Sequence, residues 1–302
     1  MKYLKTIKLF RIEKNIKISQ MKINNSRLAY SRIEHKQTKL KFNDFIQIIN
    51  TLEVTPSEFF KFSSYDDSFE KFKILINQCI ADTDNLNLKN ELLTHYYNPK
   101  NIHKKRKVEL YYLVAICGNL QEKYEEVSSL NSNEINYIFN KIVTQSFFTE
   151  YDYLIGMNIT TLLDEKMLDK LVSCMFPIKY KNKRNDLLIK YASLLLLNIT
   201  SSCIYNQNYK KALFYLNVLK EELKLHDNYY LRLSALYHES IALHFINQDT
   251  VYIENARNVI KLIREIGDIQ LSRVFEKELN NIIKNPAYYR SLKQSSIVHT
   301  RY

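Results

Sequence analysis

Turn-forming residues are scarce in this chain, which contains only 3 glycines and 4 prolines in 302 residues. Hairpins and α/β crossovers need such residues at short intervals, because glycine supplies positive φ angles and proline presets the first turn residue. Hydrophobic residues make up 46% of the chain, which is enough for a sizeable buried interior. The composition therefore predicts an all-α protein whose helices are joined by short polar loops.

Length and charge distribution both indicate two units, because single compact cores stop growing at about this chain length. Residues 1–62 carry 13 Lys and Arg against 5 Asp and Glu, a net charge of +8, whereas the whole chain carries +12. A short basic unit that also contains periodic apolar residues is typical of a DNA-binding domain. We expect a DNA-binding domain over residues 1–65, a larger helical domain over 66–285 and a C-terminal tail over 286–302.

Other classes of protein are not favoured by the sequence. The four cysteines lie far apart without metal-ligand spacing, so we expect reduced core residues and no metal or cofactor. The N-terminus has no uninterrupted apolar segment of the signal-peptide kind, and the most apolar stretch, Tyr191–Ile199, is too short to cross a bilayer. Phosphate-binding loops and nucleophile elbows do not occur. We therefore expect a cytoplasmic protein that is not an enzyme and has no membrane partner.

Helical spacing recurs through the basic unit. Apolar residues follow one another at intervals of three and four, and Ser26 is well placed to accept hydrogen bonds from the first backbone N–H groups of a helix. The helices we expect are 2–13, 27–34, one that begins at Asn43 or Asp44, and a last turn from Pro56.

The segment from Ser26 to Phe60 resembles the helix-turn-helix of Cro and repressor proteins, in the version found in Rgg and PrgX-type regulators. This resemblance implies an ion pair between Arg11 and Glu34 and a core position for Tyr30. The matching residues are Ser26–Glu34, Leu40, Phe42, Phe45, Ile48, Leu52, Val54 and Phe59–Phe60.

The second helix of the motif departs from the family pattern. Ser19-Gln20 matches the family's Ser-Gln start of that helix but lies several residues too close to Ser26. A helix that begins near Asn15 keeps the spacing and loses the Ser-Gln match. Both positions stay open, and Asn24-Asn25 stand where the family has a glycine.

In the resembling family, the helix that follows Ser26 lies in the major groove, where its first residues reach base edges. Arg27 is therefore our candidate for a bidentate contact with guanine. For the lysines that follow the helix, contact with the DNA backbone and a solvated surface are equally good hypotheses. The remaining DNA-binding candidates are Asn25, Ser26, Ser31, Arg32, Lys36, Lys39 and Lys41.

Two tripeptides, Asn158-Ile-Thr and Asn198-Ile-Thr, stand 40 residues apart in the larger domain. Spacing of this size predicts stacked helix pairs. Residues 208–216 resemble the second helix of a tetratricopeptide repeat, with Tyr209 among the consensus positions. In this register we expect a right-handed helical repeat, with Asn198 on the concave side of a first helix and Tyr209 at a contact between helices.

Together the two domains extend the resemblance to Rgg and PrgX-type regulators over nearly the whole chain. In that family, asparagines of the repeat groove clamp a peptide pheromone, because an amide can both donate to and accept from peptide backbone. The resemblance implies Asn198 as the clamp and Asn158 as its repeat-mate, with Tyr205 and Glu239 lining the groove. The alternative for Asn198 is an interior hydrogen bond between helices.

We therefore expect a quorum-sensing transcription regulator that binds a double-stranded DNA operator as a homodimer or higher oligomer and responds to a short signalling peptide. One alternative is a phage- or plasmid-type repressor without a ligand, whose helical domain only dimerises. Another is a repeat scaffold that binds protein partners. Residues 100–107 are either a further DNA contact or a solvated loop, and the tail after Pro286 is either a regulatory arm or a frayed terminus.

Overall fold

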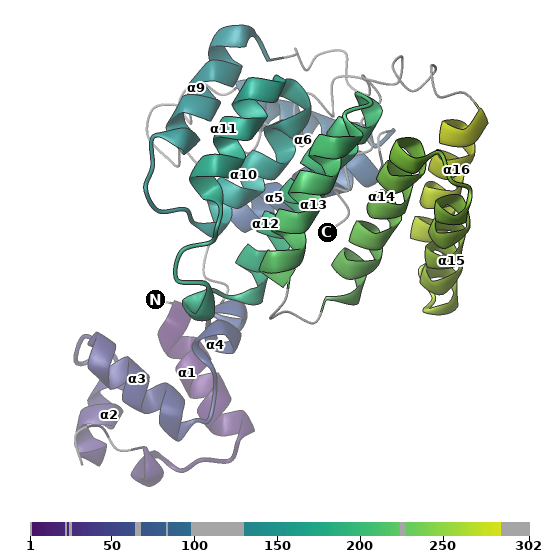
Figure 1. Ribbon diagram of the computed structural model, residues 1–302. Coiled ribbons are helices and arrows are strands. Elements are labelled where there is room, and N and C mark those ends of the chain that lie inside the picture. Colours follow the sequence, from purple (N-terminus) through teal and green to yellow (C-terminus); the bar gives the residue numbers. More distant parts are fainter. Residues whose placement is uncertain are drawn as a thin grey trace. The chain divides into compact units, whose positions relative to one another are not determined.

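The computed structural model describes residues 2–21, 23, 26–63, 68–82, 84–97, 130–223 and 228–284 (Figure 1). These residues form helices and short connections, with no strand among them and one isolated bridge between Ile23 and Ser26. The predicted all-α fold class is confirmed. The chain divides into two compact units, Met1–Phe72 and Lys73–Tyr302. The basic cluster 100–107 and the tail after residue 284 lie outside the described residues.

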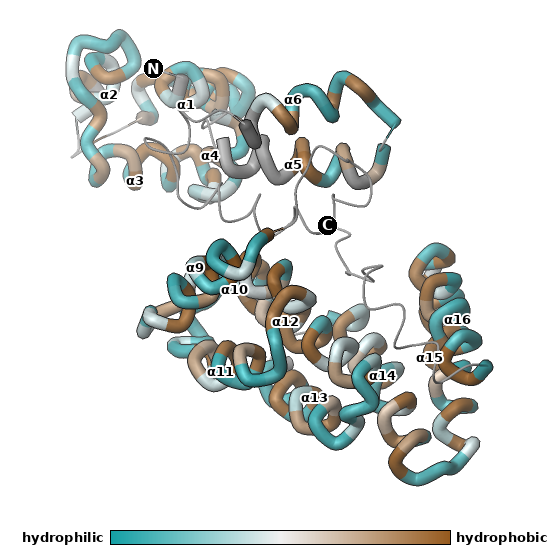
Figure 2. Tube along the Cα trace, turned by 90° about the horizontal axis from the view of Figure 1, so that it is seen from above, coloured by the Kyte–Doolittle hydropathy of each residue, from teal (hydrophilic) through white to brown (hydrophobic). Residues whose placement is uncertain are grey.

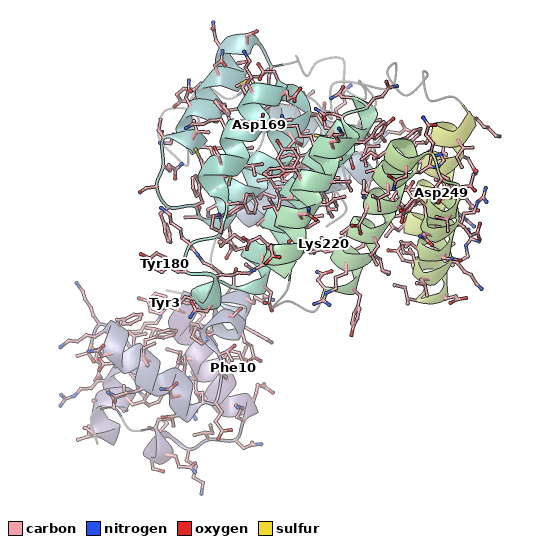
Figure 3. All side chains as sticks on the ribbon, in the orientation of Figure 1. Tyr3, Phe10, Asp169, Tyr180, Lys220 and Asp249 are labelled. Atoms are coloured by element: carbon pink, nitrogen blue, oxygen red, sulfur yellow. The ribbon has the colours of Figure 1, made fainter. Side chains whose placement is uncertain are left out.

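The first unit packs its helices around an aromatic centre. Phe59 lies at this centre, with its ring centroid 5.0 Å from that of Phe45 and 6.2 Å from that of Phe10. Phe10 can be followed in Figure 3. Tyr30 is fully buried in the same core, as expected. The helices are α1 (Lys2–Glu13), α2 (Arg27–Glu34), α3 (Phe42–Thr51) and α4 (Pro56–Phe62), with a 3₁₀ turn, η1 (Ile18–Gln20), between α1 and α2.

Neither of the two positions predicted for the second helix of the motif holds a full helix. Asn15 has a left-handed backbone with φ of 55° and follows the end of α1, so no helix begins there. Ser19 and Gln20 lie in η1, a single 3₁₀ turn, closed by a hydrogen bond of 2.7 Å from the Lys17 backbone N–H to the Gln20 side chain. Among the described residues between α1 and α2, this turn replaces the full helix that either alternative required.

The second unit is built from helix pairs that follow one another along a curved array, as Figure 2 shows. This confirms the predicted helical repeat. Tyr209 stacks on Phe245 with ring centroids 4.6 Å apart, at the contact expected for it between helices. Before the array come α5 (Ser68–Ala81), which begins in the first unit, and α6 (Leu86–Tyr97). The array itself comprises α9 (Ser132–Val143), α10 (Glu150–Ile159), α11 (Glu165–Met175), α12 (Asp186–Tyr205), α13 (Tyr209–Leu223), α14 (Tyr229–Asn247), α15 (Val251–Glu265) and α16 (Ile269–Lys284).

Helix α12 is the core of the array. It packs against α10, α13 and α14, and its residues from Leu188 to Ile204 are buried or half-buried. By length and composition it could cross a membrane, but 83% of its most apolar window is buried inside the protein. A helix that is apolar all round is expected either in a membrane or in the centre of a large core, and here its neighbours provide the core.

Alanine substitutions at two glycines should change the free energy of unfolding in opposite directions. A Cβ at Gly156, inside α10, would meet Leu195 and Met175 at ordinary contact distances of 3.6 Å, whereas Gly267 has φ of +98°. Gly156→Ala should therefore raise the free energy of unfolding by about 0.5–1 kcal/mol, because alanine favours the helix. Gly267→Ala should lower it by about 1 kcal/mol, because L residues avoid that φ. Urea denaturation followed by circular dichroism measures both, and shifts of the same sign would contradict the prediction.

Candidate DNA-binding and peptide-binding sites

A bidentate ion pair joins α1 to the end of α2. The Arg11 Nε donates to Glu34 Oε2 at 2.9 Å, and its Nη2 donates to Oε1 at 2.8 Å. The remaining Nη1 donates to the Ile16 carbonyl at 3.1 Å, so all three nitrogens of the guanidinium are engaged. The two side chains keep only 12% and 3% of their surface exposed. The pair that the family resemblance implied is thus present in the structure.

The charges of this pair are fixed by their contact. Burial on its own would raise the pKa of Glu34, but the hydrogen bonds and charge of Arg11 outweigh burial and lower that pKa below its usual value. The hydrogen bond to Glu34 raises the pKa of Arg11. A carboxylate in the last turn of a helix opposes the helix dipole, so Glu34 needs this cation to be tolerated there. The pair holds the C-terminal end of α2 against α1.

Helix α2 presents two different faces. Tyr30 and Ile33 point into the core, with 0% and 3% exposure. On the opposite face Arg32 is exposed and Ser31 is half-buried, with its Oγ 3.4 Å from Nδ1 of His35. This outer face is the surface of the helix that is available to a partner.

The other DNA-binding candidates surround α2. The Ser26 Oγ accepts from the Ala29 backbone N–H at 3.3 Å, so this hydroxyl caps the helix. Arg27 is the first helical residue, but its side chain and the whole of Asn25 lie outside the described residues. Lys36, Lys39 and Lys41 are exposed in the connection to α3, and Lys36 has φ of 60°. Apart from Asn25, the structure gathers these residues on α2 and the segment that follows it.

The two repeat asparagines are neighbours in the interior of the array. The Asn198 Nδ2 on α12 donates to the Met157 carbonyl of α10 at 3.1 Å, one residue before Asn158. The Asn158 Nδ2 donates within its own helix to the Leu154 carbonyl at 2.7 Å. Exposure is only 8% for Asn198 and 2% for Asn158. Instead of standing open on the concave surface, Asn198 makes the interior hydrogen bond between helices that the sequence analysis gave as its alternative.

Both asparagines nevertheless keep one unused group. Neither Oδ1 has a hydrogen-bond partner, although both atoms are buried. Buried polar groups are rarely left unpaired, because each unpaired acceptor costs about 1–3 kcal/mol. Because both oxygens are buried, a bound molecule could pair with them only after a local movement of the surrounding helices.

The two other groove candidates lie apart from this pair of asparagines. The Tyr205 hydroxyl, at the end of α12, donates to Glu278 Oε1 of α16 at 3.1 Å. Glu239 of α14 forms an ion pair with Lys220 of α13, which Figure 3 labels. Tyr205 and Glu239 thus bind other helices of the repeat, and the structure does not bring either of them to Asn198 by a hydrogen bond.

Ser201 of α12 and His238 of α14 form a further buried polar contact, which was not predicted from the sequence. The Ser201 Oγ lies 2.6 Å from Nε2 of His238, whose Nδ1 lies 2.7 Å from the Ser234 carbonyl. Burial lowers the pKa of His238, so its imidazole is neutral at neutral pH. Asn198, Ser201 and Tyr205 are three and four residues apart, which places them on one face of α12. This spacing was the sequence pattern that could have predicted a line of polar contacts. We call these three residues the α12 polar row.

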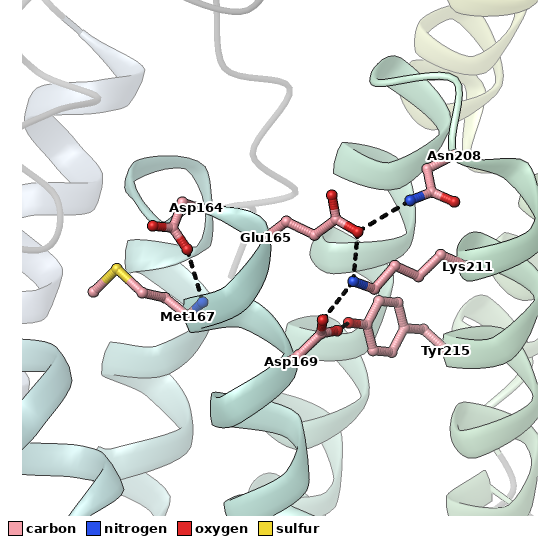
Figure 4. A network of polar contacts seen from close by, with 7 residues as sticks. All are labelled: Asp164, Glu165, Met167, Asp169, Asn208, Lys211 and Tyr215. Atoms are coloured by element: carbon pink, nitrogen blue, oxygen red, sulfur yellow. Dashed lines mark hydrogen bonds and ion pairs between the residues drawn. The ribbon is translucent and has the colours of Figure 1, made fainter.

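A second polar network joins α11 to α13 (Figure 4). The Lys211 Nζ lies 2.7 Å from a Glu165 oxygen and 2.6 Å from an Asp169 oxygen, and the Tyr215 hydroxyl donates to Asp169. Each group of this network has a partner within the repeat, so it ties two helices together. Among the described residues, no group of three or more His, Cys, Asp or Glu side chains has the arrangement of a metal site.

Replacing Glu34 by glutamine should destabilise the first unit at neutral pH and less in acid. Loss of the charge leaves Arg11 nearly buried without its counter-ion, which costs about 3 kcal/mol. Because the pKa of Glu34 is lowered on folding, the ion pair stabilises the fold above the usual pKa of 4.5, and this stabilisation is lost as pH falls through the lower, folded-state pKa.

Urea denaturation of residues 1–72 at about pH 7 and about pH 3 measures this difference, with pH values chosen to bracket the usual carboxylate range. Glu13→Gln, which neutralises an exposed carboxylate at the end of α1, is the matched control and should change little. A loss of stability in Glu34→Gln that is equal at both pH values would contradict an electrostatic role.

Comparison with known proteins shows which fold this is. No protein-family model and no curated protein matches the sequence. Among solved structures, the SHP pheromone receptor Rgg2 of Streptococcus dysgalactiae matches with a TM-score of 0.74 at 16% identity, over 92% of this chain and 99% of that chain. The PrgX/cCF10 complex matches with a TM-score of 0.74 at 20% identity, over 93% of this chain and 100% of that chain. A protein of Listeria monocytogenes EGD-e, solved as a candidate transcriptional regulator, gives a TM-score of 0.77 at 17% identity over 94% and 98%. Over nearly its whole length, the chain has the fold of Rgg2 and PrgX.

Proposed function

We propose that this chain is a cytoplasmic, sequence-specific DNA-binding transcription regulator, controlled by a short signalling peptide bound in the concave groove of its helical repeat. The observation on which the proposal rests is the order of the two units: a basic helical unit, α1 to α4, comes first and a helical repeat follows it. Rgg2 and PrgX share this fold over nearly the whole chain. Rgg2 is an SHP pheromone receptor, and PrgX has been solved with cCF10. We propose no enzymatic activity.

The DNA-binding part of the proposal rests on α2 and its charge. The outer face of α2 is accessible, and the unit around it carries a net charge of +8 over residues 1–62. A positive unit of this kind releases counterions from DNA phosphates, which supplies affinity that is independent of sequence. Specific contacts would come from Arg27 and Arg32, with backbone contacts from Ser31, Lys36 and Lys39. Asn25 and Ser26 complete the proposed set at the start of the helix.

A homodimer belongs to the same proposal. One helix-turn-helix unit buries too small an area on DNA for tight specific binding, and pairing two units allows two half-sites to be contacted together. The symmetric contact would lie in the repeat, which is the larger of the two units.

The peptide-binding part rests on the two unpaired amide oxygens. An extended peptide carries backbone N–H groups without partners, and the Oδ1 atoms of Asn158 and Asn198 are acceptors without donors. Each such pairing would remove the cost of a buried unpaired acceptor as well as add a hydrogen bond. Tyr205 and Glu239 would contribute to the groove after leaving their present partners on α16 and α13.

Arg27→Ala should cost about 1–3 kcal/mol of binding free energy on the operator and relax the preference at one base pair, because a bidentate contact with guanine is lost. A duplex selected by the full chain from a random library serves as the operator, and fluorescence anisotropy over a range of salt concentrations gives the affinity. The affinity of the unchanged protein should fall steeply with salt. Arg257→Ala, which removes an exposed arginine of α15, is the control and should leave binding unchanged. An equal loss on random duplexes would make Arg27 a backbone contact.

Asn198→Ala should lower both the melting temperature and the peptide affinity of the folded protein. The melting temperature falls because the hydrogen bond to the Met157 carbonyl is lost. Peptide affinity falls by about 1–3 kcal/mol because a buried backbone N–H of the ligand loses its acceptor. Thermal-shift screening of synthetic short hydrophobic peptides supplies the ligand, and calorimetry below the melting transition measures its affinity.

Ser201→Ala is the matched control for this experiment. It removes a hydrogen bond of the same α12 polar row, from Ser201 to His238 of α14, without touching an unpaired acceptor. It should lower the melting temperature and keep the peptide affinity. If Asn198→Ala behaves in the same way, Asn198 is a structural residue only. If no peptide binds the unchanged protein although DNA is bound, the ligand-independent repressor is the better description.

A further inference from the structure

The outer face of α2 carries one large apolar side chain. Leu28, the second residue of the helix, is 66% exposed. Successive residues of an α-helix are rotated by about 100°, so Leu28 points about 160° away from buried Tyr30 and about 140° away from buried Ile33. The same rotation places Leu28 within about 60° of Ser31 and Arg32. Leu28 therefore belongs to the face of α2 that the core does not use.

We infer that Leu28 is a specificity-determining residue that contacts the 5-methyl group of a thymine in the major groove of the operator. This inference rests on the proposed DNA-binding function and adds to it a contact of a different chemical kind. The candidates named so far are polar or cationic, and they would recognise hydrogen-bonding groups of bases or phosphates. Leu28 has neither donor nor acceptor in its side chain.

The chemistry of the groove leaves one base feature for such a side chain. In the major groove each base pair presents donors and acceptors, and the thymine methyl is the apolar group among them. Residues in the first turn of the recognition helix are those that reach base edges, and Leu28 lies in that turn. Burying a leucine against a cytosine amino group or a guanine carbonyl would leave polar atoms without water or partners, which is unfavourable.

The charge of the surroundings favours DNA over another apolar protein surface as the occupant. Arg32 is exposed on the same face of α2, and Lys36, Lys39 and Lys41 are exposed in the segment that follows it. A second protein that covered Leu28 would have to approach these cations as well, within a unit that carries +8 over residues 1–62. A polyanion with an apolar methyl group in its groove complements both features of this face.

Replacing single thymines by deoxyuridine tests the inference, because only the 5-methyl group changes. The full chain first selects duplexes from a random library, and each thymine of the selected sequence is then replaced in turn. For the unchanged protein, deoxyuridine at one position of each half-site should weaken binding about fourfold, the effect of removing one buried methyl group. Leu28→Ala should bind the thymine and deoxyuridine duplexes equally well. Leu9→Ala, an exposed leucine of α1 in the same unit, should keep the fourfold preference for thymine.

The outcomes separate this inference from the proposed function. If a sequence is selected but no thymine shows the methyl effect, or if Leu28→Ala retains it, the role of Leu28 is overturned while DNA binding stands. If Leu28→Ala changes the oligomeric state in light scattering and not the thymine preference, Leu28 contacts a second copy of the chain and the inference is wrong. If no sequence is selected at all, the proposed function fails together with the inference.

Discussion

The helical repeat depends on the burial of α12 over most of its length. A helix surrounded by neighbours has little solvent to satisfy its polar side chains, so hydrogen bonds to other helices lower the cost of burying them. The α12 polar row makes such contacts in three directions: Asn198 donates to α10, Ser201 contacts His238 of α14, and Tyr205 donates to Glu278 of α16. Such directional contacts specify one arrangement of the helices, which apolar burial alone would leave less sharply defined. One buried helix thus makes directional contacts with α10, α14 and α16.

Much of this architecture could be predicted from the sequence, because local rules agree with the fold at those places. The spacing of Leu4, Ile7 and Phe10 and the cap at Ser26 gave the bounds of α1 and α2, since periodicity and capping act within a few residues. The position of Tyr209 between helices followed from the resemblance of residues 208–216 to the second helix of a tetratricopeptide repeat. In each case the information needed lies close together in the chain.

Where the sequence was insufficient, the deciding contact is between distant segments or the element is very short. The 3₁₀ turn at Ile18–Gln20 is too short to leave a periodic pattern. The direction of the Asn198 side chain depends on the Met157 carbonyl, 41 residues away, which no spacing rule anticipates. Ser201 likewise has its partner at His238, on another helix. An asparagine on an apolar helix face is compatible with either a ligand contact or a contact between helices, and only the packing of α10 against α12 distinguishes them.

The same packing suggests how a peptide could influence the repeat at all. Asn198 has one amide with two ends: its Nδ2 holds α12 to α10, and its Oδ1 is the acceptor that we propose for a peptide N–H. A ligand that used both ends would compete with the Met157 carbonyl, whereas a ligand that used only Oδ1 would polarise and strengthen the existing bond. In either case the free energy of the proposed peptide binding would act on the contact that fixes α10 against α12. A ligand shifts a conformational equilibrium only by its differential affinity for the two states. The Asn198 amide would produce a difference in affinity between two arrangements of α10 and α12, because its position must suit the Met157 carbonyl and the peptide at the same time.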